Sequence, residues 1–424
     1  MRKKMAILQG DEVAMRVPLN ELLLSFSTAL DFVEKELLGI TTNHGRRAAY
    51  VSSRICRSMG LSEVEIFDMA GCAILHDNAL TEYLILARSS GLRSLEQFET
   101  HCLIGERNAK AFPFAGNIDN VILEHHENWD GSGFHGLKGD EIPVRSTALR
   151  LADNMDLELA MGDGRPTLGK DIREHTRKYA GSIYSPKAVE ALLKNLDDEF
   201  LRNLGDDRIE DALREEMPAL NVELNAEQLL ELCELFALII DAKSPFTRNH
   251  STRVAELTRR VSLQFGIDAE RVQEMMIAAY LHDLGKLSVP LHLLEKPGSL
   301  TSTEFHAMRH HSEVTAQLLG KVRGLDHIAH WCETHHEKLN GSGYPYGIRA
   351  PKLAFESQII AVCDIYQALA EERPYRDSLP QANVFAILDE MVALGELNPE
   401  VVNKMKEIEL VPHTPPGIIP TRLT

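Results

Sequence analysis

The sequence lacks the features of a secreted or membrane-spanning protein. No apolar run is long enough to cross a bilayer, and the apolar part of the opening segment MRKKMAILQG is too short for a secretory signal. The cysteines include no close pair, which argues against a disulfide framework and indicates a reducing compartment. They are Cys56, Cys72, Cys102, Cys233, Cys332 and Cys363. These absences predict a soluble cytoplasmic protein.

The chain also has too few basic residues to bind a polyanion by bulk charge. Its 45 Lys and Arg residues stand against 63 Asp and Glu residues, which gives a formal net charge of −18. This balance disfavours DNA, RNA and anionic membranes as partners. An anionic substrate would need a locally positive site, and bound metal ions can supply one.

Signals for β-strands are sparse, whereas apolar residues recur at helical spacing. Residues 19–38 and 226–242 show this spacing, and each segment lies at an equivalent place before a histidine. The predicted fold class is therefore all-α, with two tandem helical-bundle domains in 424 residues. The acidic, loop-prone stretch 205–221 is expected to hold the boundary, which gives domains 1–212 and 213–424.

Histidines and aspartates occur in two copies about half a chain apart. Corresponding positions are offset by 206 residues at first, then by 210 and finally by 211, so only small insertions separate the copies. Imidazole and carboxylate suit iron, manganese or zinc, and five histidines with two aspartates exceed the needs of one tetrahedral zinc ion. Each copy could therefore hold two metal ions. The first copy is His44, His76, Asp77, His101, His125, His126 and Asp153; the second is His250, His282, Asp283, His311, His335, His336 and Asp364.

A glycine-rich segment follows each His-His pair, at 127–134 and 337–344. This position is typical of a helix that ends at glycine and continues as a loop across a site. In the second copy, Gly341 and Gly343 would let the backbone approach a ligand, and Pro345 would restrict the loop. An ordinary turn would have a similar sequence.

The second half resembles the HD-GYP phosphodiesterases. The resemblance covers about residues 240–380 and rests on an ordered set of motifs: NHSTRVAELT, LHDLGKLSVP, KPGSLTSTEFHAMRHH, HHEKLNGSGYP, AVCDIYQAL and RPYR. It implies that the second domain is a full HD-GYP domain. The tandem layout with a degraded first copy is also similar to bacterial tandem HD-GYP enzymes that open 3′3′-cyclic GMP-AMP (3′3′-cGAMP).

The resemblance implies specific roles for the second set of residues. His250, His282 and Asp364 would bind one metal ion, His311, His335 and His336 would bind another, and Asp283 would bridge them. Two such ions, iron or manganese, can activate water and clamp phosphate oxygens. Lys286 would offer a point charge to a phosphate oxygen, with a solvated lysine as the alternative. His310, beside His311, is expected to face solvent or to pack nearby.

Substrate contacts also follow from the resemblance. The loop residues Gly341, Gly343, Tyr344 and Pro345 would shape the substrate site. Arg373 and Arg376 would contact the second phosphate or a guanine edge, with ordinary surface charges as the alternative. Phe246 stands where members of the three-metal type carry a glutamate, and this favours a two-metal site.

The first copy keeps all seven candidate ligands but not the substrate-handling residues. Leu80 stands at the lysine position, Asn78 and Ala79 replace Leu-Gly, and Phe134 and His135 replace Tyr-Pro. A structural or regulatory metal site and a second catalytic site are both compatible with this pattern. One hypothesis is that the first half removes the 5′-phosphate from the linear product of the second.

The predicted function is a metal-dependent phosphodiesterase that hydrolyses 3′3′-cGAMP or cyclic di-GMP to a linear 5′-phosphorylated dinucleotide. The main alternative is a non-hydrolytic, metal-bound cyclic dinucleotide receptor or scaffold, against which Lys286 and the complete second ligand set argue. A phosphohydrolase for nucleotide monophosphates conflicts with the GYP loop and RPYR. The two halves are expected to pack together within the chain, and a homodimer is left open.

Overall fold

The computed structural model describes residues 15–39, 42–83, 95–220, 222–247, 249–372 and 376–408. Helices dominate these residues, which confirms the all-α prediction. In the first half the α-helices are α1 (Leu19–Leu38), α2 (His44–Ser58), α3 (Glu63–Leu75), α5 (Leu95–Ala109), α6 (Val144–Leu159), α7 (Leu168–Tyr179), α8 (Pro186–Asn195), α9 (Asp198–Asn203) and α10 (Ile209–Glu216).

The second half repeats this helical organisation. Its α-helices are α11 (Ala226–Asp241), α12 (His250–Gln264), α13 (Ala269–Leu281), α14 (Leu291–Leu294), α15 (Ser302–Leu319), α16 (Asp326–Thr334), α17 (Phe355–Ala370), α18 (Gln381–Ala393) and α19 (Pro399–Glu407). Short 3-10 helices lie between the α-helices of both halves, namely η1 (Gly139–Glu141) and η2 (Met161–Asp163) in the first, and η3 (Pro245–Thr247), η4 (Leu284–Ser288) and η5 (Ala350–Lys352) in the second. The strands β1 (Val17–Pro18) and β2 (Glu223–Leu224) pair antiparallel, with Val17 opposite Leu224.

Local sequence signals place the two copies on equivalent helix ends. α2 and α12 begin at His44 and His250, each directly after an asparagine with φ of 66° and 61°. Asparagine is one of the few residues that tolerate this left-handed conformation. α3 and α13 each begin at a side-chain cap and end directly before a His-Asp pair. Local sequence signals therefore place each first histidine at the start of a helix and each His-Asp pair directly after the end of one.

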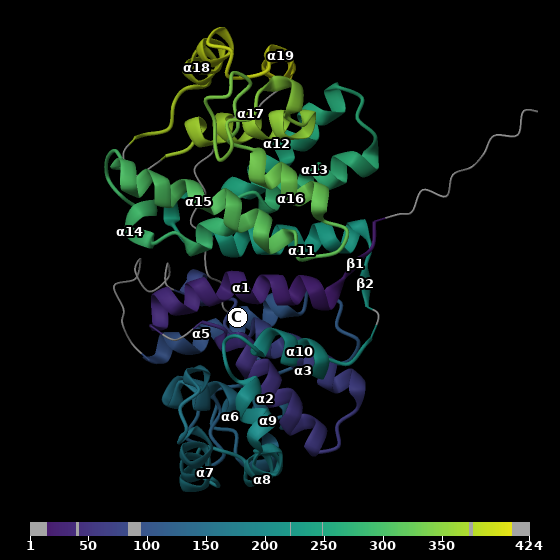
Figure 1. The fold of residues 1–424 in the computed structure, drawn as a ribbon, viewed down its shortest axis with the longest axis vertical. Coiled ribbons are helices and arrows are strands. Elements are labelled where there is room, and N and C mark those ends of the chain that lie inside the picture. The colour runs from purple at the N-terminus through teal and green to yellow at the C-terminus, as the bar shows by residue number, and fades with distance from the viewer. Residues whose placement is uncertain are drawn as a thin grey trace, which may run out of the picture.

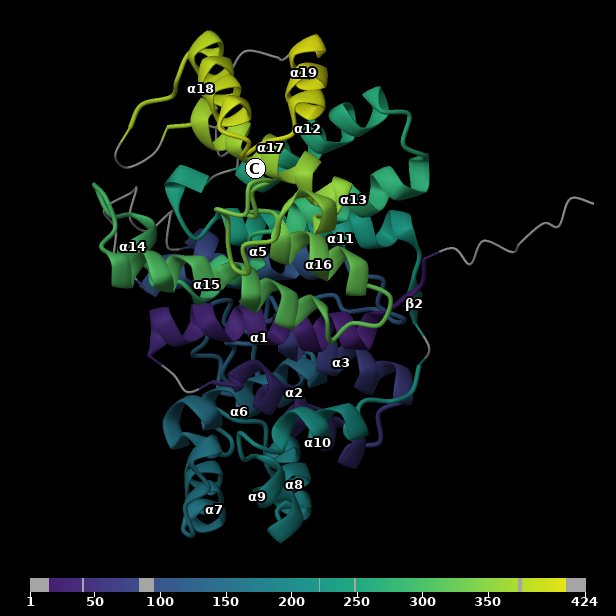
Figure 2. The ribbon, with the colours of Figure 1, turned by 45° about the horizontal axis from the view of Figure 1, so that its top comes forward.

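Helix α1 lies between the two halves and is buried by both (Figure 1). The ring of Phe26 stacks on that of Phe236 in α11, with centroids 3.3 Å apart. The Ser25 hydroxyl donates to the carbonyl of Leu318 in α15 at 2.8 Å. Buried apolar residues of both halves form one continuous cluster. Figure 2 shows the same order, with α7 to α9 at one end of the molecule and α18 and α19 at the other.

The predicted domain boundary between residues 212 and 213 falls inside α10. This helix packs against α2 of the first half. The Arg57 guanidinium donates to the Glu216 carboxylate at 2.7 Å, which ties the end of α10 to α2. We therefore propose that the division between the domains follows α10, within residues 217–222.

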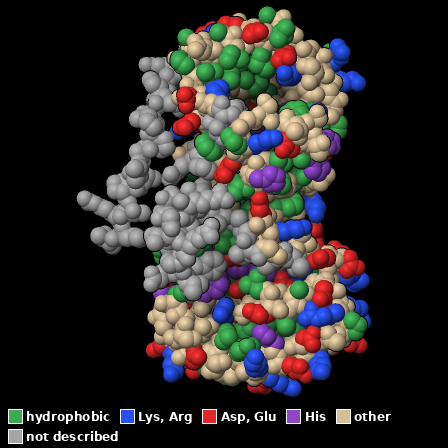
Figure 3. All heavy atoms as spheres, turned by 90° about the vertical axis from the view of Figure 1, so that its left-hand side faces the viewer, with side chains coloured by type: hydrophobic (Ala, Val, Ile, Leu, Met, Phe, Trp, Pro, Cys, Tyr) green, Lys and Arg blue, Asp and Glu red, His purple; other side chains and the backbone are tan. Residues whose placement is uncertain are grey.

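The surface charge and the cysteines can be compared with the expectations from composition. Figure 3 shows acidic and basic side chains interspersed over the visible face of the described residues, without one continuous basic surface. All six cysteines are buried as free thiols. Across the described ranges, no helix combines the length and the apolar composition that a bilayer crossing requires.

Candidate active site

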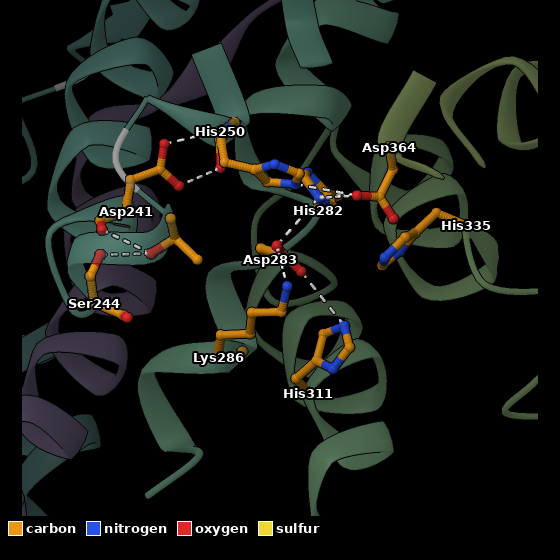
Figure 4. A network of polar contacts seen from close by, with 12 residues as sticks. Asp241, Ser244, His250, His282, Asp283, Lys286, His311, His335 and Asp364 are labelled. Carbon is orange, nitrogen blue, oxygen red and sulfur yellow. Dashed lines mark hydrogen bonds and ion pairs between the residues drawn. The ribbon is translucent and has the colours of Figure 1, made fainter. Parts of the chain in front are cut away.

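The second set of predicted ligands comes together from five helices. His250 begins α12, His282 and Asp283 follow α13, and His311 lies in the middle of α15. The other three come from the end of α16 and from α17. Figure 4 shows side chains of α12, α13, α15 and α17 pointing toward a common centre. Every member of the set is buried except His336, which is half-buried: His250, His282, Asp283, His311, His335, His336 and Asp364.

Asp283 occupies the central position in this cluster. One carboxylate oxygen lies 3.2 Å from Nε2 of His282, and the other lies 3.5 Å from Nε2 of His311. Ligand atoms lie within 4.8 Å of one another in two separate groups, one containing His250, His282 and Asp283 and one containing His311, His335 and His336. Two groups joined through one aspartate are the arrangement that a two-metal site requires.

Backbone carbonyls set the tautomer of three imidazoles. Nδ1 of His282, His311 and His335 each faces the carbonyl oxygen three residues earlier, at 2.7, 2.7 and 2.5 Å. A carbonyl only accepts hydrogen bonds, so Nδ1 carries the proton and Nε2 keeps its lone pair. These three Nε2 atoms are buried and make no hydrogen bond to any described residue. Buried lone pairs of this kind fit divalent metal ions.

Both ring nitrogens of His250 contact carboxylates. Nε2 lies 3.0 Å from Asp364, and Nδ1 lies 2.9 Å from Glu371. The Glu371 carboxylate also accepts from Arg253 at 3.1 Å. A carboxylate on the far nitrogen orients a ligand imidazole and makes it more basic. The sequence analysis did not identify Glu371, because no motif contains it.

Burial sets the protonation of the cluster near neutral pH. It lowers the pKa of His335 to about 3 and that of His311 to about 4. At His282, burial is outweighed by Asp283 and Asp364, which raise the pKa of this imidazole. Burial alone would raise the pKa of Asp283, but His282 and Lys286 outweigh it and hold this pKa well below its usual range. Neutral imidazoles and an ionised carboxylate are the forms that bind metal.

Lys286 points into the cluster from η4 (Figure 4). Its Nζ lies 2.5 Å from Asp283, and its side chain is 21% exposed. This geometry disfavours a solvated lysine. The ammonium group lies at the edge of the ligand set, where it can meet an anionic substrate.

The glycine loop packs against its own backbone beside the cluster. A Cβ atom on Gly343 would lie 2.4 Å from the Lys338 amide nitrogen, so only glycine fits there. The Tyr344 ring lies 4.6 Å from the His336 ring, and the Arg309 guanidinium lies 4.5 Å from the Tyr344 ring. The loop thus places an aromatic ring and a cation at the rim. Arg309 was not found from the sequence.

The predicted arginine contacts and His310 remain to be placed. The Arg376 guanidinium donates to the carbonyls of Leu369 and Ala368, each at 2.8 Å, near the end of α17. Its contact with substrate stays a prediction, and Arg373 lies outside the described residues. His310 is 55% exposed and lies 2.6 Å from Glu313, as expected for the neighbour of a buried ligand.

The first set of predicted ligands also comes together. Nε2 of His44 lies 3.2 Å from Asp153, and Nε2 of His101 lies 3.5 Å from Asp77. The Nδ1 atoms of His76 and His125 face carbonyl oxygens at 2.8 and 2.6 Å. Their Nε2 atoms are buried and make no hydrogen bond within the described part of the chain. The donor set of the first half therefore fits metal ions on the same grounds as the second. Its seventh member, His126, lies 3.3 Å from His101.

The rim of the first cluster differs from that of the second. His135 lies between the carboxylates of Glu124 and Glu99, at 2.6 and 2.8 Å. The Arg150 guanidinium lies 3.4 Å from Nδ1 of His126. The alanine Ala361 occupies the corresponding place in the second copy, counted back from the final aspartate. The first site therefore has a cation on a wall where the second has alanine, and Leu80 where the second has lysine.

Helix α1 adds a carboxylate that sequence analysis missed. Glu34 is 2% exposed, and one of its oxygens has no hydrogen-bond partner among the described residues. Burial raises its pKa to about 8, which the nearby His44 partly opposes. Ile240 lies ten residues before His250, as Glu34 lies before His44. The sequence did contain a signal for Glu34, because the corresponding residue of the second copy, Ile240, is apolar.

Comparisons with known proteins agree with this architecture. A model of the HD domain matches residues 33–168 and 234–401. The 3′3′-cGAMP-specific phosphodiesterase 1 of Vibrio cholerae is 28% identical over 402 residues, which span 92% of this chain and 91% of that protein. A cyclic di-GMP phosphodiesterase of Thermotoga maritima is 33% identical over 184 residues, which span 43% of this chain and 50% of that protein.

A solved structure is similar over most of the chain. The crystal structure of a cyclic GMP-AMP specific phosphodiesterase of V. cholerae, V-cGAP3, matches with a TM-score of 0.66 and 26% sequence identity. The match covers 92% of this chain and 97% of that one. This chain belongs to the HD domain family and carries two segments that match it.

Proposed function

We propose that the C-terminal half hydrolyses a cyclic dinucleotide to a linear 5′-phosphorylated dinucleotide. The observation that carries this proposal is the pair of ligand groups joined by Asp283, with Lys286 2.5 Å from the same carboxylate. The names of the similar proteins supply the substrate class. The complete ligand set together with Lys286 argues for catalysis rather than for a receptor or scaffold without hydrolysis.

The residues divide into metal-holding, orienting and substrate-facing groups. His250, His282 and Asp364 would hold one divalent ion, and the second group of histidines would hold the other, with iron and manganese both suited to these donors. Such ions supply water activation and charge neutralisation at phosphate. Glu371 and the backbone carbonyls fix the imidazole rings. The Lys286 ammonium would stabilise the negative charge that builds on a non-bridging phosphate oxygen in the transition state.

Two cyclic dinucleotides compete as the substrate, and we favour 3′3′-cGAMP. The V. cholerae protein named for 3′3′-cGAMP matches 92% of this chain, whereas the T. maritima protein named for cyclic di-GMP matches 43%. The ligand cluster itself does not distinguish the two substrates, because it would contact the phosphate, which both contain. Tyr344 and Arg309 at the rim supply the ring and the cation on which a base can stack.

Product chromatography tests this proposal. Purified protein loaded with iron or manganese is incubated in parallel with 3′3′-cGAMP and with cyclic di-GMP. We expect a linear 5′-phosphorylated dinucleotide in at least one reaction, and a chelator added beforehand should prevent it. Intact substrates in both reactions, with metal present in the protein, would favour the receptor or scaffold.

We further propose that the first half removes the 5′-phosphate from this linear product. The supporting observation is its complete ligand cluster with a changed rim, where Leu80 replaces the lysine, Arg150 adds a guanidinium beside His126, and His135 lies between two carboxylates. A phosphomonoester has a more highly charged terminal phosphate than a diester. In the first half, this phosphate would lie near the Arg150 guanidinium, whereas the second half presents Lys286.

The variant Asp77→Ala tests this second step. We expect linear 5′-phosphorylated dinucleotide to accumulate, with the rate of ring opening within about twofold of wild type because Asp77 lies in the other half. The measurement is a chromatographic time course of both products. Dephosphorylated dinucleotide formed at the wild-type rate would exclude the first half as its source.

A further inference from the structure

Lys243 is a buried cation beside the catalytic segment. It lies between α11 and η3, and its side chain is 7% exposed. Its Nζ donates to the carbonyls of Leu287 at 2.6 Å and Val289 at 2.7 Å. These carbonyls lie at the end of η4 and just beyond it, where a short helix leaves acceptors without partners of its own. Lys243 therefore holds the distal end of the segment that carries Lys286.

A carboxylate from the first half completes this contact. Glu36 in α1 lies 2.9 Å from Lys243 Nζ through one oxygen. Its other oxygen accepts the backbone amide of Leu291 at 2.6 Å. Figure 1 shows α1 running directly below α14 and α15, consistent with these contacts. One residue of the first half thus binds both the buried cation and the backbone that follows η4.

The opposite side of η4 is held by α15. The Gly285 amide donates to the Thr315 hydroxyl at 2.8 Å. A Cβ atom on Gly285 would lie 1.9 Å from the His311 carbonyl oxygen, which shows how closely the two segments pack. Lys286 therefore lies on a segment fixed by α15 on one side and by Lys243 and Glu36 at its end.

The internal repeat gives an independent comparison. Counting back 206 residues from Lys243 and Lys286 gives Leu37 and Leu80. The second copy has both lysines, and the first copy has neither. Both lysines are thus present in one copy and absent from the other, as expected if Lys243 positions Lys286.

We propose that Glu36 and Lys243 are positioning residues for Lys286, so that the first half completes the catalytic site of the second. This inference rests on the proposed phosphodiesterase function. A displacement of about 1 Å in a catalytic group can reduce turnover by about 10²-fold. The contacts with Leu287, Val289 and Leu291 restrict such a displacement.

A double-mutant cycle tests the pairing of the two lysines. Lys243→Met should lower kcat by about 10- to 100-fold, with KM within about threefold and metal content unchanged. Lys243→Arg keeps the cation and should restore much of the rate. In a Lys286→Ala background, Lys243→Met should lower kcat by less than about a further twofold, because the side chain that Lys243 positions is already absent. Losses that multiply in the double variant would overturn the inference.

Hydrogen exchange provides a readout that needs no activity. Glu36→Ala removes the acceptor of the Leu291 amide and should increase exchange across residues 284–291. The matched control is Glu21→Ala, which breaks another contact from α1 to the second half, a 2.7 Å ion pair with the exposed Arg323. It should leave exchange across 284–291 unchanged. Unaltered exchange in Glu36→Ala would contradict the positioning role even if no cyclic dinucleotide were hydrolysed.

Discussion

Asp283→Ala is expected to lower kcat/KM for cyclic dinucleotide hydrolysis by at least about 10³-fold, equivalent to roughly 4 kcal/mol of transition-state stabilisation. Its two oxygens lie 3.2 Å from His282 and 3.5 Å from His311, so this one side chain joins both ligand groups. Its removal should lower the metal content as well as the rate. Steady-state kinetics and elemental analysis of the purified variant measure the two effects.

An adjacent pair of histidines provides the control for this experiment. His311→Ala removes a buried ligand and should behave like Asp283→Ala. His310→Ala changes the exposed neighbour and should keep the rate within about twofold, as surface substitutions usually do. Undiminished turnover by Asp283→Ala would show that hydrolysis occurs elsewhere.

Lys286→Ala is expected to lower kcat by about 10²- to 10³-fold, the usual effect of removing a group that stabilises charge in a transition state. The lysine contacts Asp283 but is not itself a metal donor, so metal content should be retained. Kinetics together with elemental analysis separate this result from that of Asp283→Ala.

Lys296→Ala is the matched control for the lysine. Lys296 lies ten residues later and pairs with Glu304 at 2.5 Å, with 30% of its side chain exposed. Its replacement should leave kcat within about twofold of wild type. Loss of metal and rate together in Lys286→Ala would instead mark Lys286 as a structural partner of Asp283.

The sequence was sufficient to predict the clusters because their members recur at nearly constant offsets. Each first histidine begins a helix and each His-Asp pair directly follows one, so local signals also give their places in the fold. The choice of His311 over His310 agrees with the observed burial. The two-residue strands β1 and β2 could not be predicted, because a pair of residues shows no alternation.

The carboxylates that orient His44 and His250 could not be found by comparing the two copies. Asp156 binds Nδ1 of His44 from three residues after Asp153, whereas Glu371 does the same for His250 from seven residues after its own aspartate. Equivalent roles at unequal offsets do not appear in a comparison of the copies. The contact of Glu36 with Lys243 spans 207 residues and has no counterpart in the first copy, so it required the structure.

The central place of α1 has a consequence for how the protein is made. Phe26 leaves the ribosome 210 residues before Phe236, the ring on which it stacks. At about 5–20 residues per second, roughly 10–40 s pass between them. During this time the face of α1 that contacts α11 is uncovered and open to chaperones. Synthesis that stops short of α11 would leave this apolar face without its partner, so the nascent chain completes its core only after the second half emerges.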